Sequence, residues 1–245
     1  MWLRRISAVA VALVVSLASS ESARGDDSGA IVGAALTAVV GALVCPSVAL
    51  GVHESDDTSE YERKGWFVNL AGTYAVQKFE SSLRGELSGA AGAPVDVETD
   101  DSLGVNAGGG YRCHRYFSTE LEVEWIDEFE TDISQAGVGA IGSMDPGPMT
   151  VTTNFKGYLP FGRFQPYALA GGGIMFTKVS AKDLTGSGLI QSEKVKAFAF
   201  RFGGGLDFYA TEHIVLNIGA EQVIPVGADL DLDYISVGWG IQYRF

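Results

Sequence analysis

The sequence predicts an all-β fold, an eight-stranded antiparallel up-and-down transmembrane β-barrel, preceded by an amino-terminal signal and apolar segment. Three observations lead to this prediction. Residues 235–245 alternate strictly between apolar and polar or small side chains, which is the period of a strand with one apolar face. Similar stretches recur along the chain, and short and long connections alternate between them. A strand of this length, tilted by about 45°, crosses an apolar band roughly 25 Å tall.

The composition supports one all-β domain with leader segments. The chain has 245 residues with 32 Gly and 7 Pro, and only 19% of its residues are charged. Its formal net charge of −13 argues against a nucleic-acid partner. The two cysteines, Cys45 and Cys113, imply no disulfide framework, because Cys45 is lost if it is removed with a leader.

The amino-terminal part divides into residues 1–23, a signal peptide, and residues 24–61, an apolar segment with a charged linker. Arg4 and Arg5 precede an apolar run and then small residues, as in a secretory signal. Three interpretations of the second apolar run, residues 29–51, stay open. It is a second signal core cleaved after Ala49, a retained helix of small residues, or a lipoprotein signal ending at Cys45. The barrel domain is expected over residues 62–245.

Eight strands are expected in the barrel domain. They cover residues 66–78, 103–112, 117–129, 149–158, 166–178, 195–208, 214–223 and 235–245. Alternate apolar side chains should face lipid, for example Phe198, Phe200 and Phe202 in the sixth strand. In the fifth strand, Tyr167, Leu169 and Met175 are the expected outward residues.

The connections indicate the orientation in the membrane. Residues 113–116, 159–165 and 209–213 are short, whereas 80–101, 130–148 and 179–193 are long. Barrels of this class place short turns in the periplasm and long loops outside, so both termini should be periplasmic. Aromatic residues gather near the short turns, as expected for a headgroup girdle.

The same alternation places charged side chains in the lumen. They are Arg112, Glu120, Glu122, Glu124, Lys156, Lys178, Arg201, Asp207, Glu221 and Arg244. Eight strands leave an interior just wide enough for side chains, and buried charges must be paired. Hairpin register favours the pairs Glu120 with Lys156 and Glu221 with Arg201. We expect a packed ionic core that plugs the barrel, and a gated ion path is the alternative.

Catalytic, metal and cofactor sites are not expected. The Gly-Gly-Gly runs at 108–110, 171–173 and 203–205 lie in strands, not at the strand-to-helix turn that a phosphate-binding loop needs. Asp229, Asp231 and Asp233 are interpreted as a solvated loop rather than a metal site, and so are Glu98, Asp100 and Asp101. The histidines, His53, His114 and His213, fall outside the expected outer rim, so a hydroxyl nucleophile there has no visible base.

Three short motifs carry a family resemblance. They are Gly65-Trp66-Phe67, the run Pro166 to Gly173 and the terminal Tyr243-Arg244-Phe245. Over residues 62–245 the chain resembles the outer-membrane protein β-barrel domain family, eight-stranded barrels similar to the OmpA membrane domain and to opacity-type proteins. The resemblance implies that the barrel-assembly machinery reads the last strand. It carries that role to Trp239, Ile241, Tyr243 and Phe245.

Together these features predict a protein of the Gram-negative outer membrane with a structural or surface-interaction role. Its expected partners are outer-membrane lipid, the barrel-assembly machinery and an unknown surface ligand, and it is expected to be a monomer without a cofactor. The alternative is a porin-like channel for ions or small solutes. A soluble lipocalin-like ligand-binding barrel is less favoured, because its interior would be apolar rather than charged.

Overall fold

The computed structural model describes residues 59–78, 84–85, 88–89, 94–135, 139–183, 190–226 and 232–245. The expected signal peptide, residues 1–23, and residues 24–58 of the apolar segment and linker lie outside this range. No helix within the described residues is long and apolar enough to cross a membrane.

Besides the helical residues 84–85 and 88–89, the described chain has one short 3₁₀ helix and ten strands. They are η1 (Glu60–Glu62), β1 (Gly65–Gln77), β2 (Val95–Thr99), β3 (Ser102–His114), β4 (Phe117–Ile126), β5 (Thr131–Gln135), β6 (Gly139–Tyr158), β7 (Phe164–Asp183), β8 (Ile190–Tyr209), β9 (Ile214–Val226) and β10 (Tyr234–Arg244). Every strand pairing is antiparallel.

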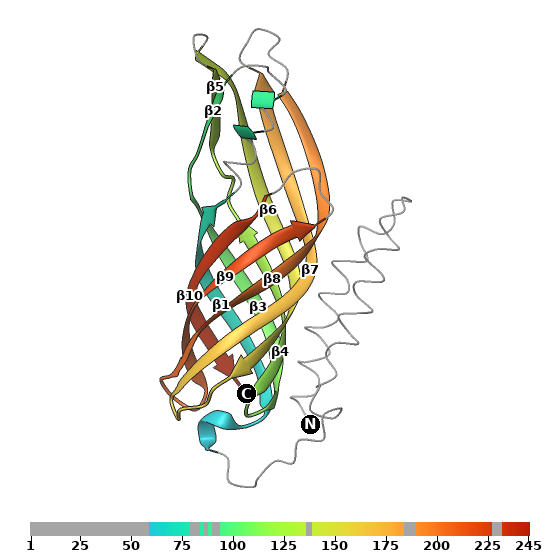
Figure 1. The fold of residues 1–245 in the computed structure, drawn as a ribbon. Coiled ribbons are helices and arrows are strands. Elements are labelled where there is room, and N and C mark those ends of the chain that lie inside the picture. Colours follow the sequence, from blue (N-terminus) through green and yellow to red (C-terminus); the bar gives the residue numbers. More distant parts are fainter. Residues whose placement is uncertain are drawn as a thin grey trace, which may run out of the picture. The chain divides into compact units, whose positions relative to one another are not determined.

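Eight of these strands form a closed barrel, which confirms the predicted fold (Figure 1). Their order is β6-β4-β3-β1-β10-β9-β8-β7, and pairing between β6 and β7 closes the ring. The first and last barrel strands are neighbours, with Ala71 of β1 opposite Gly240 of β10. We call the end with the short β3–β4, β6–β7 and β8–β9 connections the turn end, and the opposite end the loop end.

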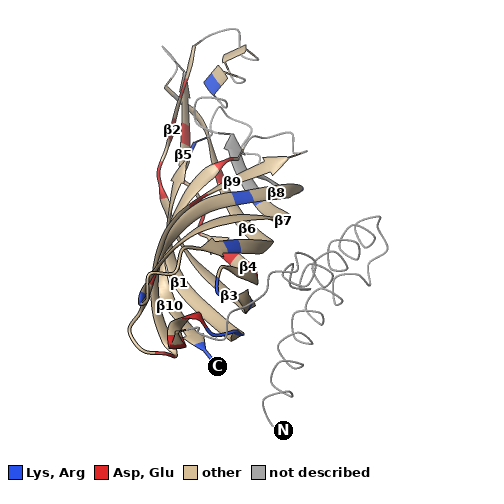
Figure 2. Ribbon diagram, turned by 60° about the horizontal axis from the view of Figure 1, so that its bottom comes forward, with Lys and Arg blue, Asp and Glu red and all other residues tan. Residues whose placement is uncertain are grey.

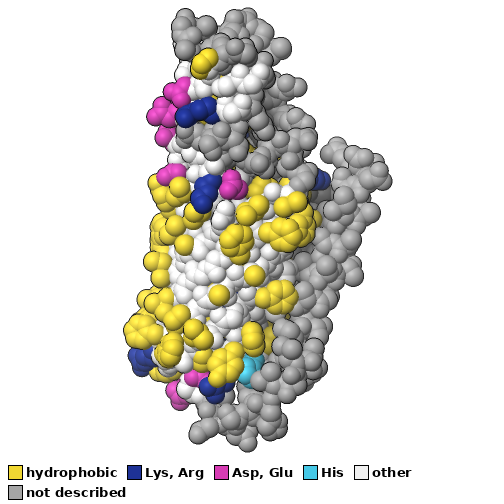
Figure 3. Space-filling model, viewed as in Figure 1, with side chains coloured by type: hydrophobic (Ala, Val, Ile, Leu, Met, Phe, Trp, Pro, Cys, Tyr) yellow, Lys and Arg dark blue, Asp and Glu magenta, His cyan; other side chains and the backbone are white. Residues whose placement is uncertain are grey.

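The outer wall of the barrel is apolar. Outward side chains such as Leu70, Leu103 and Ile218 are 59%, 63% and 56% exposed, as the alternation predicted. Figure 3 shows apolar side chains over the wall, with acidic and basic side chains beyond them at both ends. Trp239 and Phe245 of the last strand region also face outward, at 51% and 49% exposed.

The predicted faces of the fifth barrel strand are wrong. In β7, Leu169 and Met175 are 4% and 1% exposed, and Tyr167 lines an interior cavity. The inward positions are therefore the odd-numbered ones. The run that contains Ala168 and Leu169 is apolar on both faces, so its alternation does not distinguish wall from lumen.

The loop end carries a sheet where the sequence predicted loops. β2 pairs with β5, β5 pairs with the first part of β6, and β7 and β8 extend alongside (Figure 1). We call this five-stranded extension the outer sheet. β6 begins at Gly139 rather than Met149, although it contains Pro146 and Pro148. Proline usually marks a strand end because it lacks an N–H donor, which explains why the extension was missed.

Candidate functional site: the charged lumen

Arg201 of β8 is the centre of the lumen, and its side chain is fully buried. Its Nη1 donates hydrogen bonds to Glu122 Oε1 at 2.6 Å and Glu221 Oε2 at 2.9 Å. Its Nη2 donates to Glu124 Oε2 at 2.5 Å and Thr150 Oγ1 at 2.8 Å. One guanidinium thus joins β4, β6, β8 and β9 across the barrel. It reaches several acceptors at once because its N–H donors are arranged in a planar fork.

Glu124 of β4 is held by β10 as well. Its Oε2 accepts a hydrogen bond from the Tyr234 hydroxyl at 2.8 Å, and its Oε1 accepts one from the Ser236 hydroxyl at 2.6 Å. Glu124 is 0% exposed. A buried carboxylate needs such partners, since water is not available to replace them.

Lys156 of β6 forms the second cationic centre. Its Nζ lies 3.0 Å from Glu120 Oε2 and 4.7 Å from the centre of the Tyr167 ring. Asn154 Nδ2 then links two carboxylates, donating to Glu122 Oε2 at 3.1 Å and to Glu120 Oε1 at 3.4 Å. We call the six charged groups at this height the ionic layer: Glu120, Glu122, Glu124, Lys156, Arg201 and Glu221. Figure 2 marks acidic and basic positions on neighbouring barrel strands.

A second layer closes the turn end around Arg112. Its Nη1 donates to Gln165 Oε1 at 2.6 Å and to the Tyr209 hydroxyl at 2.7 Å. Its guanidinium lies 4.3 Å from the Tyr158 ring centre, and its Nη2 donates to the Arg115 carbonyl at 2.5 Å. Arg112 lies in the lumen as its strand alternation predicted, but the alternation gave no indication of these neutral partners.

The segment before the barrel completes this layer. Arg244 Nη1 donates to the Tyr61 carbonyl at 2.9 Å and to the Tyr209 hydroxyl at 3.1 Å, and its Nη2 donates to the Arg63 carbonyl. Gln165 Nε2 donates to the same Tyr61 carbonyl at 3.2 Å. The rings of Tyr61 and Tyr209 meet edge to face at 5.5 Å. Residues that the sequence suggested were only a linker therefore lie across the turn end of the lumen.

A third layer, on the loop-end side of the ionic layer, is apolar. We call it the apolar layer: Ala75, Ile126, Phe129, Met175, Ala199, Val223, Leu232 and Tyr234, all buried. Tyr234 links the apolar layer to the ionic layer, because its hydroxyl reaches Glu124 while its ring lies 6.2 Å from that of Phe129. The sequence contained an indication of this layer. Trp125 and Ile126 are adjacent apolar residues on opposite faces of a strand, so one of the two faces the lumen.

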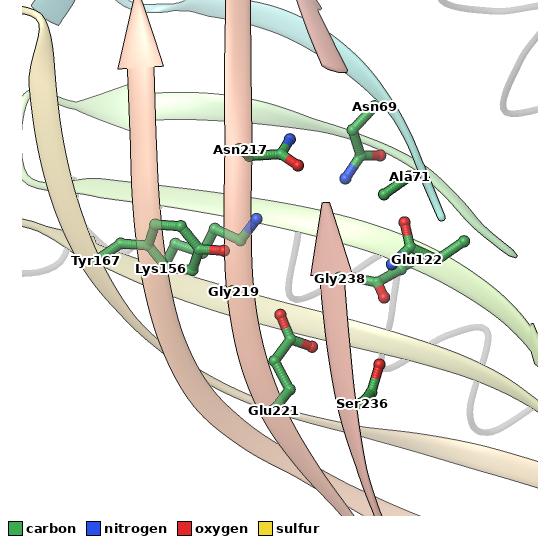
Figure 4. A pocket seen from close by; sticks show the side chains of 11 residues that line it. Asn69, Ala71, Glu122, Lys156, Tyr167, Asn217, Gly219, Glu221, Ser236 and Gly238 are labelled. Atoms are coloured by element: carbon green, nitrogen blue, oxygen red, sulfur yellow. The ribbon is translucent and has the colours of Figure 1, made fainter. Parts of the chain in front are cut away.

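A small polar cavity lies within the lumen, beside the ionic layer (Figure 4). Its volume is about 30 Å³, room for one or two water molecules. The amides of Asn69 and Asn217 and the carboxylates of Glu122 and Glu221 border it. Asn69 Oδ1 has no hydrogen-bond partner among the described residues, so it is free to accept a bond from water.

The prediction for Lys178 is wrong, and this changes the charge balance of the lumen. The Lys178 side chain is 58% exposed, and its Nζ lies 4.0 Å from Glu128 Oε1 outside the barrel. Lys178 lies in β7, the strand whose predicted inward and outward faces are exchanged. The nine other residues predicted to line the lumen comprise five acids and four bases. Among the acids, Asp207 is 1% exposed, and neither carboxylate oxygen has a hydrogen-bond partner among the described residues.

The described histidines lie at the turn end. His114 is 3% exposed and its ring packs against Tyr116, with centroids 5.4 Å apart. His213 is exposed, and its Nδ1 lies 2.9 Å from the Arg244 carbonyl oxygen. His53 lies outside the described residues.

The cysteine and acidic motifs have separate outcomes. Cys113 is buried, and Cys45 lies outside the described residues, so the expectation that no disulfide framework is implied stays a prediction. Asp229 and Asp231 lie outside the described residues. Within the described part of the chain, no group of three or more His, Cys, Asp or Glu is arranged to hold a metal ion.

A closed antiparallel barrel with an apolar wall and a charged interior defines the class: a transmembrane β-barrel. The chain belongs to the outer membrane protein beta-barrel domain family, whose model matches residues 9–245. It is therefore an outer-membrane β-barrel protein, as the resemblance of its motifs implied. No curated protein sequence matches the chain.

Solved outer-membrane barrels show a distant likeness. Neisserial surface protein A is 10% identical, with 75% of this chain and 100% of that chain covered, at a TM-score of 0.49. OprG from Pseudomonas aeruginosa is 16% identical, with 77% and 99% covered, at a TM-score of 0.48. Ail of Yersinia pestis is 14% identical, with 74% and 97% covered, at a TM-score of 0.43. The family assignment rests on the family model alone.

Proposed function

We propose that this protein is a closed, monomeric barrel of the Gram-negative outer membrane with a structural or surface-interaction role. The loop end faces the cell exterior and displays the outer sheet. Both termini are periplasmic, and the protein is not an enzyme. The barrel serves as an anchor, and a partner at the cell surface binds the outer sheet or the loops around it.

The observation that carries this proposal is the filling of the lumen by three successive layers. The turn-end residues, the ionic layer and the apolar layer each join side chains from opposite sides of the ring. An ion crossing the apolar layer would have to shed its hydration shell with no polar replacement, which is strongly unfavourable. A lumen filled in this way favours an anchor over a pore.

The polar cavity favours the alternative, a channel for ions or small solutes. However, its volume of about 30 Å³ holds only water and is too small to form a continuous path for ions through the lumen. Planar-bilayer recording separates the two functions. We expect the full-length protein to show little or no steady conductance at neutral pH, while a porin measured in the same bilayers conducts. Large, stable open channels would contradict the closed-barrel proposal.

The orientation is tested separately with epitope tags. One tag is inserted in the connection between β7 and β8, within residues 184–189, and another at Gly162 in the β6–β7 turn, where φ is +63°. We expect antibody to bind the first tag on intact cells and the second only after the outer membrane is permeabilised. The reverse pattern would place the outer sheet in the periplasm.

The assembly role is proposed for the last strand. Trp239, Ile241 and Tyr243 are 51%, 47% and 47% exposed on the outer wall, and Phe245 follows at 49%. Side chains that face lipid in the finished barrel are accessible to the assembly machinery before insertion. Substituting Tyr243 and Phe245 with alanine should slow insertion in cells while leaving refolding in detergent nearly unchanged.

A further inference from the structure

A cluster of lysines lies on β7 and β8 at the loop end, in a chain whose net charge is −13. Lys178 of β7 is exposed, and so is Lys196 of β8. Lys194 is two residues before Lys196 in β8, and its backbone partner across the sheet is Lys178. We call these three residues the lysine sector.

The lysine sector borders an aromatic stripe of the barrel wall. Phe176 is the backbone partner of Lys196, and the Lys196 ammonium lies 5.7 Å from the Phe176 ring centre. Phe198 and Phe200 continue the outward face of β8 and are 48% and 49% exposed. Positive charge thus meets apolar surface directly, along the two strands. Lysine side chains at such a border extend their ammonium groups to the headgroup level of a bilayer.

The rest of the described loop-end rim is mostly acidic. Asp101 accepts a hydrogen bond from Tyr74 at 2.8 Å, and exposed Asp127 and Glu128 follow β4. Glu128 approaches Lys178, but at 4.0 Å between half-exposed side chains this pair is screened by water. The lysine sector is therefore a local reversal of charge on this rim.

We propose that the lysine sector and the adjoining Phe198–Phe200 stripe bind a phosphate-bearing membrane lipid. The ammonium groups of Lys178 and Lys196 hold the headgroup phosphates, Lys194 adds a third positive charge to the same pair of strands, and the phenyl rings contact the acyl chains. Given the proposed orientation of the barrel, this lipid is a phosphorylated glycolipid of the outer leaflet. Lipid bound at this position would also hold β7 and β8 beneath the outer sheet.

The chemistry of the sector fits this ligand better than a soluble anion. Lysine ammonium groups bind phosphate as point charges, and several of them beside an apolar surface add their attraction to an anionic lipid. A free anion gains only the charge interaction, in water and next to the competing carboxylate of Glu128. A lipid gains the acyl contacts as well.

The test uses full-length protein refolded in zwitterionic detergent, where orientation in a cell has no influence. Binding of fluorescent diphosphorylated lipid A is compared with binding of the same lipid lacking both phosphates. We expect the wild type to prefer the phosphorylated lipid at least tenfold. Each of K178Q, K194Q and K196Q should weaken its binding about fivefold. The triple variant should bind both lipids alike.

Matched controls make the result specific. K78Q removes another exposed lysine at the end of β1 and should leave binding within about twofold of the wild type. The triple arginine variant K178R/K194R/K196R should keep the preference. Heat-modifiable gel mobility checks that every variant is folded.

Three outcomes would overturn the proposal: equal binding of both lipids by the wild type, an unchanged preference in the triple glutamine variant, or an equal loss in K78Q. Displacement of the lipid by millimolar inorganic phosphate would overturn the choice of a lipid over a soluble anion. Failure of the proposed orientation is detected separately by the epitope tags, because the detergent assay gives the same result for either orientation.

Discussion

Arg201 and Arg63 make ion pairs of nearly equal length in contrasting surroundings. Arg201 Nη1 lies 2.6 Å from Glu122, with side chains 0% and 4% exposed, whereas Arg63 Nη2 lies 2.7 Å from Glu212, with side chains 53% and 43% exposed. Water replaces a lost partner at the surface but not in the lumen. The contribution of each pair to stability therefore depends on burial, and not on distance.

Substituting Arg201 with methionine should lower the free energy of unfolding by about 3–5 kcal/mol, because it leaves buried carboxylates without their shared cation. Arg63→Met is the matched control and should cost at most about 1 kcal/mol. Urea unfolding in detergent, followed by tryptophan fluorescence, measures both. Equal decreases in the free energy of unfolding for the two variants would show that the ionic layer does not stabilise the barrel more than a surface ion pair does.

Sequence reasoning worked well for single residues where a strand alternates cleanly. It placed Arg201 and Glu221 in the lumen, where they lie 2.9 Å apart, and suggested that pair from hairpin register. It could not find Tyr234, Ser236 or Thr150, since the hydroxyl partners of the ions come from strands distant in sequence. Alternation tells which face a residue occupies, but not which residues meet across the ring.

At the scale of elements, the glycine runs allow close approach between neighbouring strands. A Cβ atom on Gly173 of β7 would collide with the Val151 carbonyl oxygen of β6 and lie 2.7 Å from Thr152 Cα. These are backbone atoms, so no rotamer change relieves the contact. Gly157 of β6 differs, since a Cβ there would meet nothing within 4 Å. The predicted structural role of the run 171–173 fits this contrast.

Gly173→Ala should therefore destabilise the barrel by about 1–3 kcal/mol, the usual effect of overpacking. Gly157→Ala should be neutral or slightly stabilising, because it restricts only the unfolded chain. The folded fraction after refolding, read from heat-modifiable mobility across a urea series, measures both effects. The prediction is contradicted if the two alanine variants unfold at the same urea concentration.

The segment around η1 is a second element whose stability depends on particular contacts. Arg244 donates hydrogen bonds to the carbonyls of Tyr61 and Arg63, so the last barrel strand holds the segment that precedes the first. Arg115 contacts the same segment more weakly, with Nε 3.7 Å from Glu62 Oε2. Closure of the ring and seating of η1 should therefore occur together.

Arg244→Met should loosen this segment without opening the barrel. Two charge-assisted hydrogen bonds are lost, so trypsin cleavage after Arg63 or Lys64 should accelerate by about tenfold or more. Arg115→Met is the control and should change the rate only slightly. Mass spectrometry of timed digests identifies the cut. An unchanged rate in Arg244→Met would mean that other contacts fix the segment.

The elements themselves could be predicted only in part. The eight barrel strands followed from alternation, but β2 and β5 did not, because Val95–Thr99 and Thr131–Gln135 are short and lie in loops rich in Gly, Ala and Pro. The error in β7 has another cause. Its turn-end half is apolar on both faces, since Leu169 packs inside the lumen while its neighbours face lipid.

At the scale of the whole molecule, the lumen combines layers of opposite character. In the ionic layer each charge needs a partner in a fixed position. In the apolar layer the Tyr234 hydroxyl is already bonded to Glu124, and the other side chains offer no polar group to an ion. Neither could be read from the sequence as a layer, since the ionic layer combines residues from β4, β6, β8 and β9, and the apolar layer combines residues from β1, β4, β7, β8, β9 and β10 or from their connections. Their succession along the barrel axis arises only when the ring closes.

This succession predicts that closure of the lumen is redundant. Arg201→Ala with Glu124→Ala removes the main cross-links of the ionic layer, and Phe129→Ala with Met175→Ala thins the apolar layer. Either pair alone should leave single-channel conductance near the wild-type level, since the other layer still blocks ions. The four substitutions together should give measurable openings, because the layer that remains, at the turn end, is polar and offers hydrogen-bonding groups to water and ions. Phe200→Ala on the outer wall is the control and should have no effect on conductance.

Openings in the Phe129→Ala/Met175→Ala variant alone would assign the seal to the apolar layer. Absence of conductance in a folded quadruple variant would assign the seal to the turn-end residues around Tyr61 and Arg112.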